Sequence, residues 1–209
     1  MAKGTRLLLV RHGTTDANTK GLFLGHTDAA LSEIGHREVA LLGQRLAGHP
    51  VDVLVSSDLQ RARHTADAIA AARADAIETR TDPRLKEMHL GDFEGVPATD
   101  VRARHPERMA RWVDDPAHVR MPGADAETLS EVQARAWEAV SELVADHAGQ
   151  QLVVVSHTFT LLTLLCRFLD LPIASFRRLH VDRASISEIN WSRYGATLRR
   201  FNDTAHLKP

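Results

Sequence analysis

The sequence predicts a single α/β domain: a three-layer sandwich in which a mostly parallel sheet lies between two layers of helices. Three short runs, at residues 7–10, 51–55 and 152–155, carry this prediction, and only Asp52 interrupts their apolar character. Runs without regular polar alternation are typical of strands buried on both faces. A segment with helical spacing follows each run, and such strand–helix alternation indicates right-handed crossovers in an α/β sheet.

Local signals place the helices between these strands. Ser32 is a suitable N-cap for a helix that carries Val39, Leu42 and Leu46 on one face. A second helix should begin just after residues 56–58. Two more are expected, one opened by the capping box of Thr128 and Glu131 and one running through Leu169 to a stop at Pro172.

The remaining segments are less regular. Residues 81–127 contain five prolines and are expected to form an insertion with short helices that lies over the site, across one end of the sheet. Residues 184–201 alternate like two strands joined at 194–195. No repeat or linker divides the chain, so we expect one domain over residues 1–209.

Bulk composition excludes several classes of protein. The net charge is −1 and the pI about 6.9, which gives no overall field for nucleic acid or an anionic membrane. No apolar stretch approaches the ~20 residues needed to span a bilayer. The one cysteine, Cys166, lies among leucines, which favours a buried structural thiol and a reducing compartment. The sequence therefore predicts a cytoplasmic protein.

Polar residues follow the predicted strands where each one ends. Arg11 and His12 follow the first, Arg61 lies one turn beyond the second, and His157 and Thr158 follow the third. In open α/β sheets ligands bind beyond the carboxyl ends of the strands, so these residues should converge. Four possible cations would repel one another in an empty site, and a bound dianion removes that repulsion. Phosphate is the anion that fits best, because two N–H groups of one guanidinium can bind two of its oxygens at once.

Each residue alone also has an ordinary structural explanation. A single histidine after a strand is more often a hydrogen-bonded loop residue, and an arginine near a helix start is usually solvated. The remaining ten histidines show no spacing typical of a metal site, and neither a metal nor a cofactor is expected. The joint pattern is what favours a phosphate site.

That joint pattern resembles the histidine phosphatase family, the phosphoglycerate mutase-like superfamily. The resemblance covers nearly the whole chain, with its motifs in the family's order. The segments that carry it are Arg11-His12-Gly13-Thr14-Thr15 with Asn18, Asp28-x-x-Leu31-Ser32-x-x-Gly35, Ser56-Ser57-Asp58-Leu59-x-Arg61-Ala62, Leu85-Lys86-Glu87-x-x-x-Gly91-x-x-Glu94-Gly95 and Val155-Ser156-His157.

The resemblance implies a phosphomonoester hydrolase that works through a phosphohistidine on His12. One ring nitrogen of His12 would attack phosphorus, while a backbone carbonyl would hold the other as a donor. Arg11, Arg61 and His157 would bind the phosphoryl oxygens, and a dianion beside His157 would raise its pKa. Asn18 and the backbone N–H of Thr158 would add neutral donors.

The proton donor is less well defined. The resemblance places Glu87 in this role, whereas the residues alone leave Glu87, Asp92 and Glu94 as alternatives. The chain also departs from the family pattern: Thr158 stands where glycine is frequent, and Leu24 replaces a polar side chain near the expected substrate entrance. These departures predict an altered substrate preference around an intact phosphate pocket.

Two other functions remain open, namely a cofactor-dependent phosphoglycerate mutase and a phosphate-binding module without catalysis. The expected partner is a small phosphorylated metabolite whose identity the sequence does not fix. Five arginines could favour an acidic substrate if they overhang the pocket, or they could be solvated or paired with Glu107, Asp114 and Asp115. An edge strand near the C-terminus makes a homodimer possible. The arginines are Arg102, Arg104, Arg108, Arg111 and Arg120.

Overall fold

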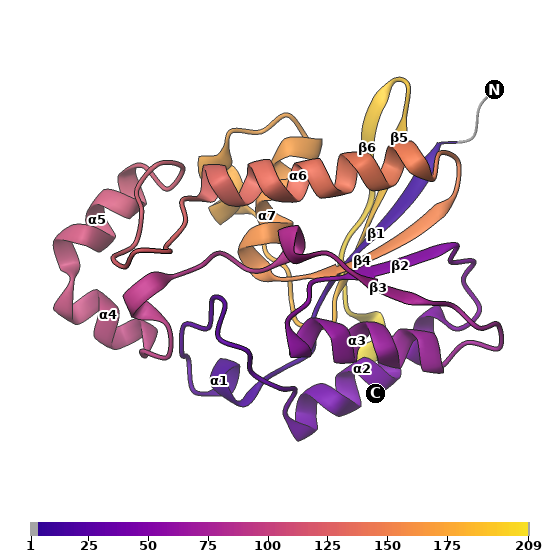
Figure 1. Ribbon diagram of the computed structural model, residues 1–209, viewed down its shortest axis with the longest axis horizontal. Coiled ribbons are helices and arrows are strands. Elements are labelled where there is room, and N and C mark those ends of the chain that lie inside the picture. Colours follow the sequence, from indigo (N-terminus) through magenta and orange to yellow (C-terminus); the bar gives the residue numbers. More distant parts are fainter. Residues whose placement is uncertain (1–3, 209) are drawn as a thin grey trace.

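A computed structural model of the chain, which describes residues 4–208, confirms the α/β fold (Figure 1). Its strands are β1 (Thr5–Arg11), β2 (Val53–Ser56), β3 (Thr79–Thr81), β4 (Gln151–Ser156), β5 (Ile186–Ser192) and β6 (Gly195–Asp203). They form one sheet in the order β3-β2-β4-β1-β5-β6. The first four strands of this order pair in parallel, and β5 is antiparallel to both β1 and β6. The carboxyl ends of β1, β2 and β4 therefore share one edge of the sheet.

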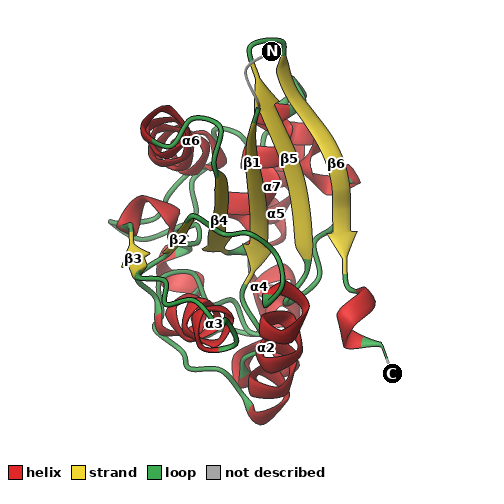
Figure 2. Ribbon diagram, turned by 90° about the vertical axis from the view of Figure 1, so that its right-hand side faces the viewer, coloured by secondary structure: helices red, strands yellow, loops and turns green. Residues whose placement is uncertain are grey.

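Helices cover both faces of the sheet (Figure 2). The helices α2 (Glu33–Leu46) and α3 (Gln60–Ala71) pack on one face, and α6 (Leu129–Asp146) and α7 (Thr158–Phe168) on the other. The alternation of β1 divides its apolar side chains between the two cores: Leu8 and Val10 join the core of α2 and α3, while Leu7 and Leu9 join that of α6 and α7. Burial on both faces explains the uninterrupted apolar run.

The helix starts follow the predicted signals. The Ser32 hydroxyl accepts a hydrogen bond from the Gly35 N–H, and Thr128 and Glu131 form the predicted capping box. The C-terminal hairpin of β5 and β6 is also present, with β6 at the edge of the sheet, and the homodimer remains a prediction. The sequence analysis missed β3, because its three residues are half-buried or exposed and carry no apolar pattern.

Segment 81–127 forms short helices, as predicted. They are η1 (Pro83–Leu85), η2 (Gly91–Phe93), α4 (Ala98–Arg104) and α5 (Pro106–Asp114). Figure 1 shows α4 and α5 extending the molecule beyond the edge where the parallel strands end. Trp112 of α5 anchors this extension, because its ring lies 6.0 Å from that of Phe159 and 5.6 Å from that of Phe176. Three other short helices complete the chain: α1 (Asp16–Thr19), η3 (Ile173–Arg178) and η4 (Ala205–Leu207).

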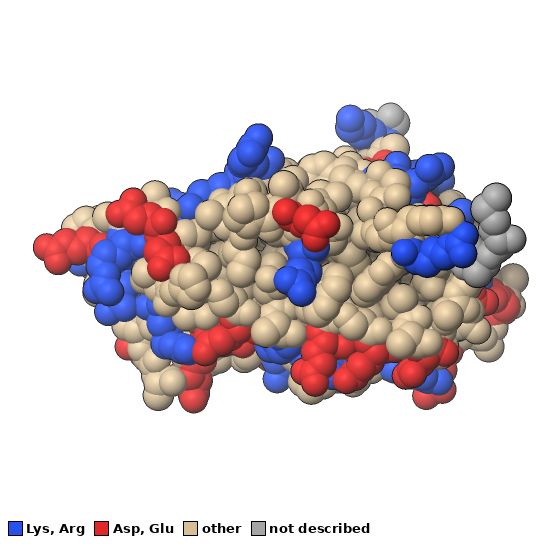
Figure 3. All heavy atoms as spheres, turned by 90° about the horizontal axis from the view of Figure 1, so that it is seen from above, with Lys and Arg blue, Asp and Glu red and all other residues tan. Residues whose placement is uncertain are grey.

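Two expectations about the bulk of the chain can be compared with the structure. Cys166 is fully buried in α7, and burial raises the pKa of its thiol to about 11, which fits a structural role. Over residues 4–208, no helix combines the length and apolar character needed to cross a membrane. In Figure 3 basic and acidic side chains are interspersed on the face in view, in keeping with the near-zero net charge.

The segment after β1 is held by an unusually close approach of backbone to backbone. The Ser32 N–H donates to the Thr14 carbonyl at 2.9 Å, which brings the first turn of α2 against residues 13–14. A Cβ on Gly35 would lie 2.0 Å from that same carbonyl oxygen, so only glycine fits there. The Asp-x-x-Leu-Ser-x-x-Gly segment thus positions the residues that follow β1.

We expect Gly35→Ala to lower the free energy of unfolding by about 1–3 kcal/mol, because the new methyl group forces α2 away from residue 14. Urea denaturation at neutral pH measures the loss. Gly48→Ala is the matched control, since Gly48 is exposed and has no atom within 4 Å of a built Cβ. Equal stability of the two variants would contradict the close approach.

Candidate active site

A pocket of about 220 Å³ opens at the carboxyl edge of the parallel strands. Six of the seven residues predicted for the site line it, and the seventh, His157, packs its ring against that of His12 with a centroid distance of 5.0 Å. The fold therefore brings together residues that lie up to 147 positions apart in the chain. The six are Arg11, His12, Asn18, Arg61, Glu87 and Thr158.

His12 is fixed in one tautomer. Its side chain is only 3% exposed, and its Nδ1 lies 2.7 Å from the Gly13 carbonyl oxygen. Because a carbonyl oxygen can only accept, Nδ1 carries the proton and Nε2 keeps its lone pair. A backbone carbonyl was the predicted partner. Burial and the charges of Arg61 and Arg11 lower the pKa of His12 well below its usual value, so the ring is neutral.

Of the two pocket arginines, Arg61 is fully buried and Arg11 is half-buried, and both are only partly hydrogen-bonded. Arg61 donates to the carbonyls of Thr27 and Gly25, both at 2.8 Å, and Arg11 donates to that of Val181 at 2.7 Å. The Nε atom of each has no partner among the described residues. Burial lowers the pKa of Arg61 and, together with the charge of Arg183, that of Arg11 to about 10, so both remain cations at neutral pH.

His157 is fully buried, and neither of its ring nitrogens has a hydrogen-bond partner within residues 4–208. Burial and the nearby charge of Arg61 lower its pKa well below the usual value. The ring is therefore neutral in the free enzyme. The protonated form expected from the sequence requires a negative charge in the pocket.

These unpartnered groups share one place in the molecule. A buried donor without a partner costs roughly 1–3 kcal/mol, and a cation without a counter-charge costs more. The Nε atoms of Arg11 and Arg61 and the ring nitrogens of His157 together leave several such groups beside the His12 ring. An anion that accepts several hydrogen bonds would satisfy the Nε–H groups of both arginines and the single ring N–H of neutral His157.

Glu87 lies at the first turn of α7, next to the end of β4. Its carboxylate accepts hydrogen bonds from the backbone N–H groups of Phe159 at 3.0 Å, Thr160 at 3.3 Å and Met88 at 3.0 Å. His157 provides no side-chain cap for this helix, so the Glu87 carboxylate satisfies its amino-terminal N–H groups.

The structure separates Glu87 from the two alternatives that the residues alone left open. Glu94 accepts hydrogen bonds from the N–H groups of His26, Thr27 and Leu90 at 2.7–3.1 Å, so its carboxylate joins the loop at residues 26–27 to the backbone at residue 90. Asp92 lines a different hollow. Of the three carboxylates, only Glu87 lines the pocket that contains His12.

Asn18 and Thr158 provide the neutral edge of the pocket. The Asn18 side-chain oxygen accepts from the Thr15 N–H at 3.1 Å, so its amide nitrogen remains available as a donor. Thr158 is the first residue of α7, where backbone N–H groups have no partner within the helix.

Sequence reasoning missed two arginines near the site. Arg135 of α6 donates to the carbonyls of Arg84, Lys86 and Glu87 at 2.6–2.9 Å and pairs with Glu127 at 2.7 Å, which holds the backbone that presents Glu87. Arg183 influences the pKa of both Arg11 and His12. Each stands as a single charge in a polar stretch of sequence, so no pattern distinguishes it from a solvated arginine.

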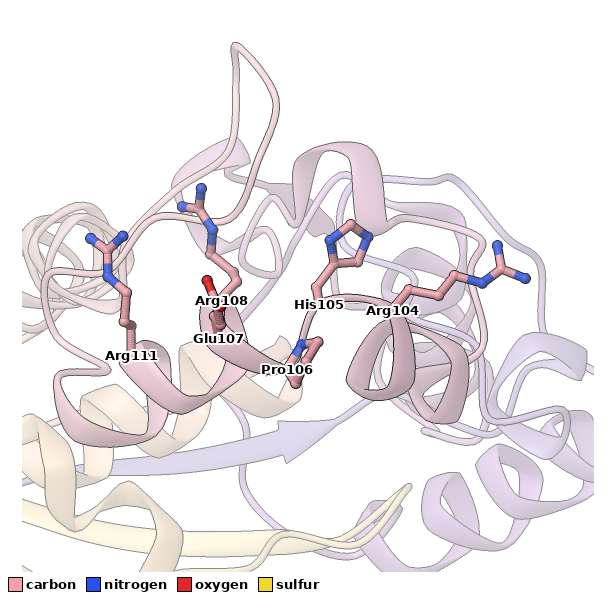
Figure 4. Close-up of a pocket in the computed structure, with 6 residues that line it drawn as sticks. All are labelled: Arg104, His105, Pro106, Glu107, Arg108 and Arg111. Atoms are coloured by element: carbon pink, nitrogen blue, oxygen red, sulfur yellow. The ribbon is translucent and has the colours of Figure 1, made fainter.

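The five arginines of segment 81–127 do not line the pocket. Four of them, Arg102, Arg104, Arg111 and Arg120, are exposed to solvent, as one alternative predicted. Where partners are formed they differ from Glu107, Asp114 and Asp115: Arg104 pairs with Asp100, Arg108 donates to the Arg120 carbonyl, and Arg120 pairs with Glu131. A larger, open hollow of about 430 Å³ lies at the junction of α4 and α5. In Figure 4 the side chains of Arg108 and Arg111 extend in a similar direction, whereas that of Arg104 extends to the other side of the hollow.

The depressed histidine pKa values predict that the ligand-free protein loses stability as the pH falls below about 6.5. In that range an unfolded histidine takes up a proton, whereas His12 and His157 do not, so each lowers the free energy of unfolding by up to about 1.4 kcal/mol per pH unit. Urea denaturation from pH 8 to 5 in phosphate-free buffer measures this slope.

We expect His157→Gln to reduce that slope measurably, while His36→Gln, which changes an exposed histidine of α2, should not. An unchanged slope in His157→Gln would show that His157 is not held neutral by burial.

Comparisons with known proteins agree with this geometry. A sequence model of the histidine phosphatase superfamily (branch 1) matches residues 7–204. Phosphoserine phosphatase 1 of Hydrogenobacter thermophilus is 33% identical over 97% of this chain and 94% of its own length. A probable phosphoglycerate mutase (GpmB) of Yersinia pestis is 32% identical with the same coverage. The solved structure of a mycobacterial glucosyl-3-phosphoglycerate phosphatase with VO3 has a TM-score of 0.85 at 29% identity, covering 94% of this chain and 98% of its own. The chain belongs to the histidine phosphatase superfamily.

Proposed function

We propose that this protein hydrolyses phosphomonoesters of small metabolites through a phosphohistidine on His12. The observation that carries the proposal is the neutral Nε2 of His12 beside buried cations and donors that lack partners. A phosphoryl group bound there faces a nucleophile and has its negative charge stabilised at the same time. The names of the relatives support phosphate esters as the substrate class, while the alcohols in those names differ.

The first chemical step transfers the phosphoryl group to the enzyme. His12 Nε2 forms a bond to phosphorus as the bond from phosphorus to the ester oxygen breaks, and Glu87 gives that oxygen a proton, so the alcohol leaves neutral. Arg11 and Arg61 stabilise the charge on the remaining phosphoryl oxygens, and His157 joins them once the dianion supplies the charge that favours its protonation.

The second step returns the enzyme to its starting state. Water attacks phosphorus, its proton passes to the Glu87 carboxylate, and the bond between phosphorus and Nε2 breaks, which releases inorganic phosphate. The three backbone N–H groups that bind the Glu87 carboxylate keep it in place through both steps. The repulsion between this carboxylate and the incoming dianion is relieved by one shared proton, which is the proton the ester oxygen needs.

Hydrolysis is favoured over the two other functions by the lining of the pocket. Arg11 and Arg61 are the basic residues that line it together with His12, and all three serve one phosphoryl group. A mutase needs further cations for a carboxylate and a second phosphate. A module that only binds phosphate needs neither the fixed His12 tautomer nor a carboxylate at Glu87. We also infer a cytoplasmic location, from the reduced and buried Cys166.

His12→Ala should abolish turnover of p-nitrophenyl phosphate while the fold is kept, because the variant lacks the ring nitrogen that attacks phosphorus. Incubation with a 32P-labelled ester, followed by alkaline quenching, should trap acid-labile label on the wild type and none on the variant. Unchanged turnover in His12→Ala would refute the nucleophile. Rapid interconversion of phosphoglycerates with little phosphate release would show a mutase instead.

Glu87→Gln tests the proton donor. We expect kcat/KM for an alkyl phosphate to fall by roughly 10²–10⁴-fold, because an alkoxide leaves poorly without a proton. The fall for p-nitrophenyl phosphate should be far smaller, since nitrophenolate needs no proton. The glutamine oxygen can still accept from the α7 N–H groups, so folding should persist. An equal loss with both esters would assign Glu87 a structural role only.

A further inference from the structure

The pocket has two chemically distinct sides. Its polar side holds the groups assigned above to the phosphoryl group. Its other side is built from apolar residues, namely Leu22, Phe23, Leu24, Leu90 and Phe159. Since the phosphoryl group occupies the polar side, the apolar side is what the alcohol part of the ester meets.

The apolar side is a fixed surface. Leu24 and Leu90 are buried, and Leu90 belongs with Phe93 to the hydrophobic core that α6 covers. Phe159 contacts the aromatic rings of Trp112 and Phe176 at centroid distances of 6.0 and 5.9 Å. These rings therefore keep their positions when a substrate enters. The side chains of this surface carry no polar group that could rotate to face the substrate.

The charges around the pocket disfavour an anionic alcohol. Both lining arginines are assigned to the phosphoryl group, and Glu87 is assigned to the leaving oxygen as its proton donor, so neither a cation nor a free donor remains for a carboxylate on the alcohol. Arg183, although electrostatically coupled to Arg11, is not one of the lining residues. A carboxylate on the alcohol would lose its hydration shell where it contacts the leucine and phenylalanine side chains. It would gain no positive charge to compensate for that loss.

Building on the proposed function, we propose that the preferred substrates are phosphomonoesters of small, uncharged and largely apolar alcohols. The cavity volume of about 220 Å³ lies below the roughly 300–1,000 Å³ of sites for drug-sized ligands, which restricts the alcohol to a few carbon atoms. Phosphorylated hydroxy acids, such as those in the names of the relatives, are poor substrates.

An isosteric pair of esters tests the proposal with the wild-type protein. Isopentyl phosphate and 3-phosphooxypropanoate share the O–CH2–CH2 stem and end in an isopropyl group and a carboxylate. We expect kcat/KM to favour the isopentyl ester at least tenfold, and to rise roughly 3–10-fold per methylene group from methyl to butyl phosphate until the cavity is filled. Equal rates, or preference for the carboxylate, would overturn the proposal.

A pair of variants links the selectivity to this wall. Leu22→Arg introduces a cation from a half-buried position at the pocket, where a long side chain can reach water. We expect it to shift the ratio of kcat/KM at least tenfold towards 3-phosphooxypropanoate. Leu41→Arg, at a residue of α2 that is 40% exposed, should leave the ratio unchanged. The ratio of kcat/KM for the two esters does not depend on the fraction of protein that is folded. Leu24→Gln provides a second, milder change on the apolar side of the pocket.

The outcomes separate the two proposals. If p-nitrophenyl phosphate is hydrolysed through His12 but the carboxylate ester is preferred, the enzyme is a phosphatase and the substrate class is wrong. If Arg183→Ala then abolishes that preference, Arg183 is the carboxylate-binding residue. If no ester is hydrolysed, the proposed function itself fails. An unchanged ratio in Leu22→Arg would show that the alcohol does not contact this wall.

Discussion

The buried positive charge at the carboxyl edge of the sheet is the constraint on which the rest of the site depends. Two guanidinium groups are held out of water with part of their hydrogen-bonding capacity unused. They are tolerated because backbone carbonyls of the loops accept hydrogen bonds from some of their N–H groups. The free energy that it costs to bury these cations is recovered as binding energy when a dianion enters. It also keeps both histidines neutral, which leaves His12 a nucleophile and makes His157 responsive to the substrate.

Helix α7 connects this electrostatic centre to the proton-transfer group. Its first residues supply Thr158 and Phe159 to the pocket, and its amino-terminal N–H groups hold the Glu87 carboxylate. Arg135 secures the same loop from the other side through three carbonyls. The Glu87 carboxylate thus caps the amino-terminal end of α7 and also lines the pocket, so its position follows from the secondary structure.

The sequence predicted the sheet and the residues at its edge well, because both follow from local signals. Apolar runs such as residues 152–155 define central strands, and the polar residues at their ends must meet if the strands are parallel. The missed features depend on contacts between distant parts of the chain. The choice of Glu87 over Glu94, which the residues alone left open, depends on which carboxylate lines the pocket of His12, and the contacts of Arg135 depend on carbonyls some 50 residues away. Likewise, β3 exists only because β2 offers it an edge.

The position of His12 also ties the nucleophile to a strand far along the chain. Its carbonyl accepts from the Ala184 N–H, the Arg11 N–H donates to the Ser185 carbonyl, and β1 pairs with β5 from Thr5 to Val10. The end of β1 is therefore fixed only when β5, which is synthesised much later, is in place. Contacts of such large sequence separation form late in folding. A growing chain would thus carry the complete nucleophile motif without a working site until β5 has been made.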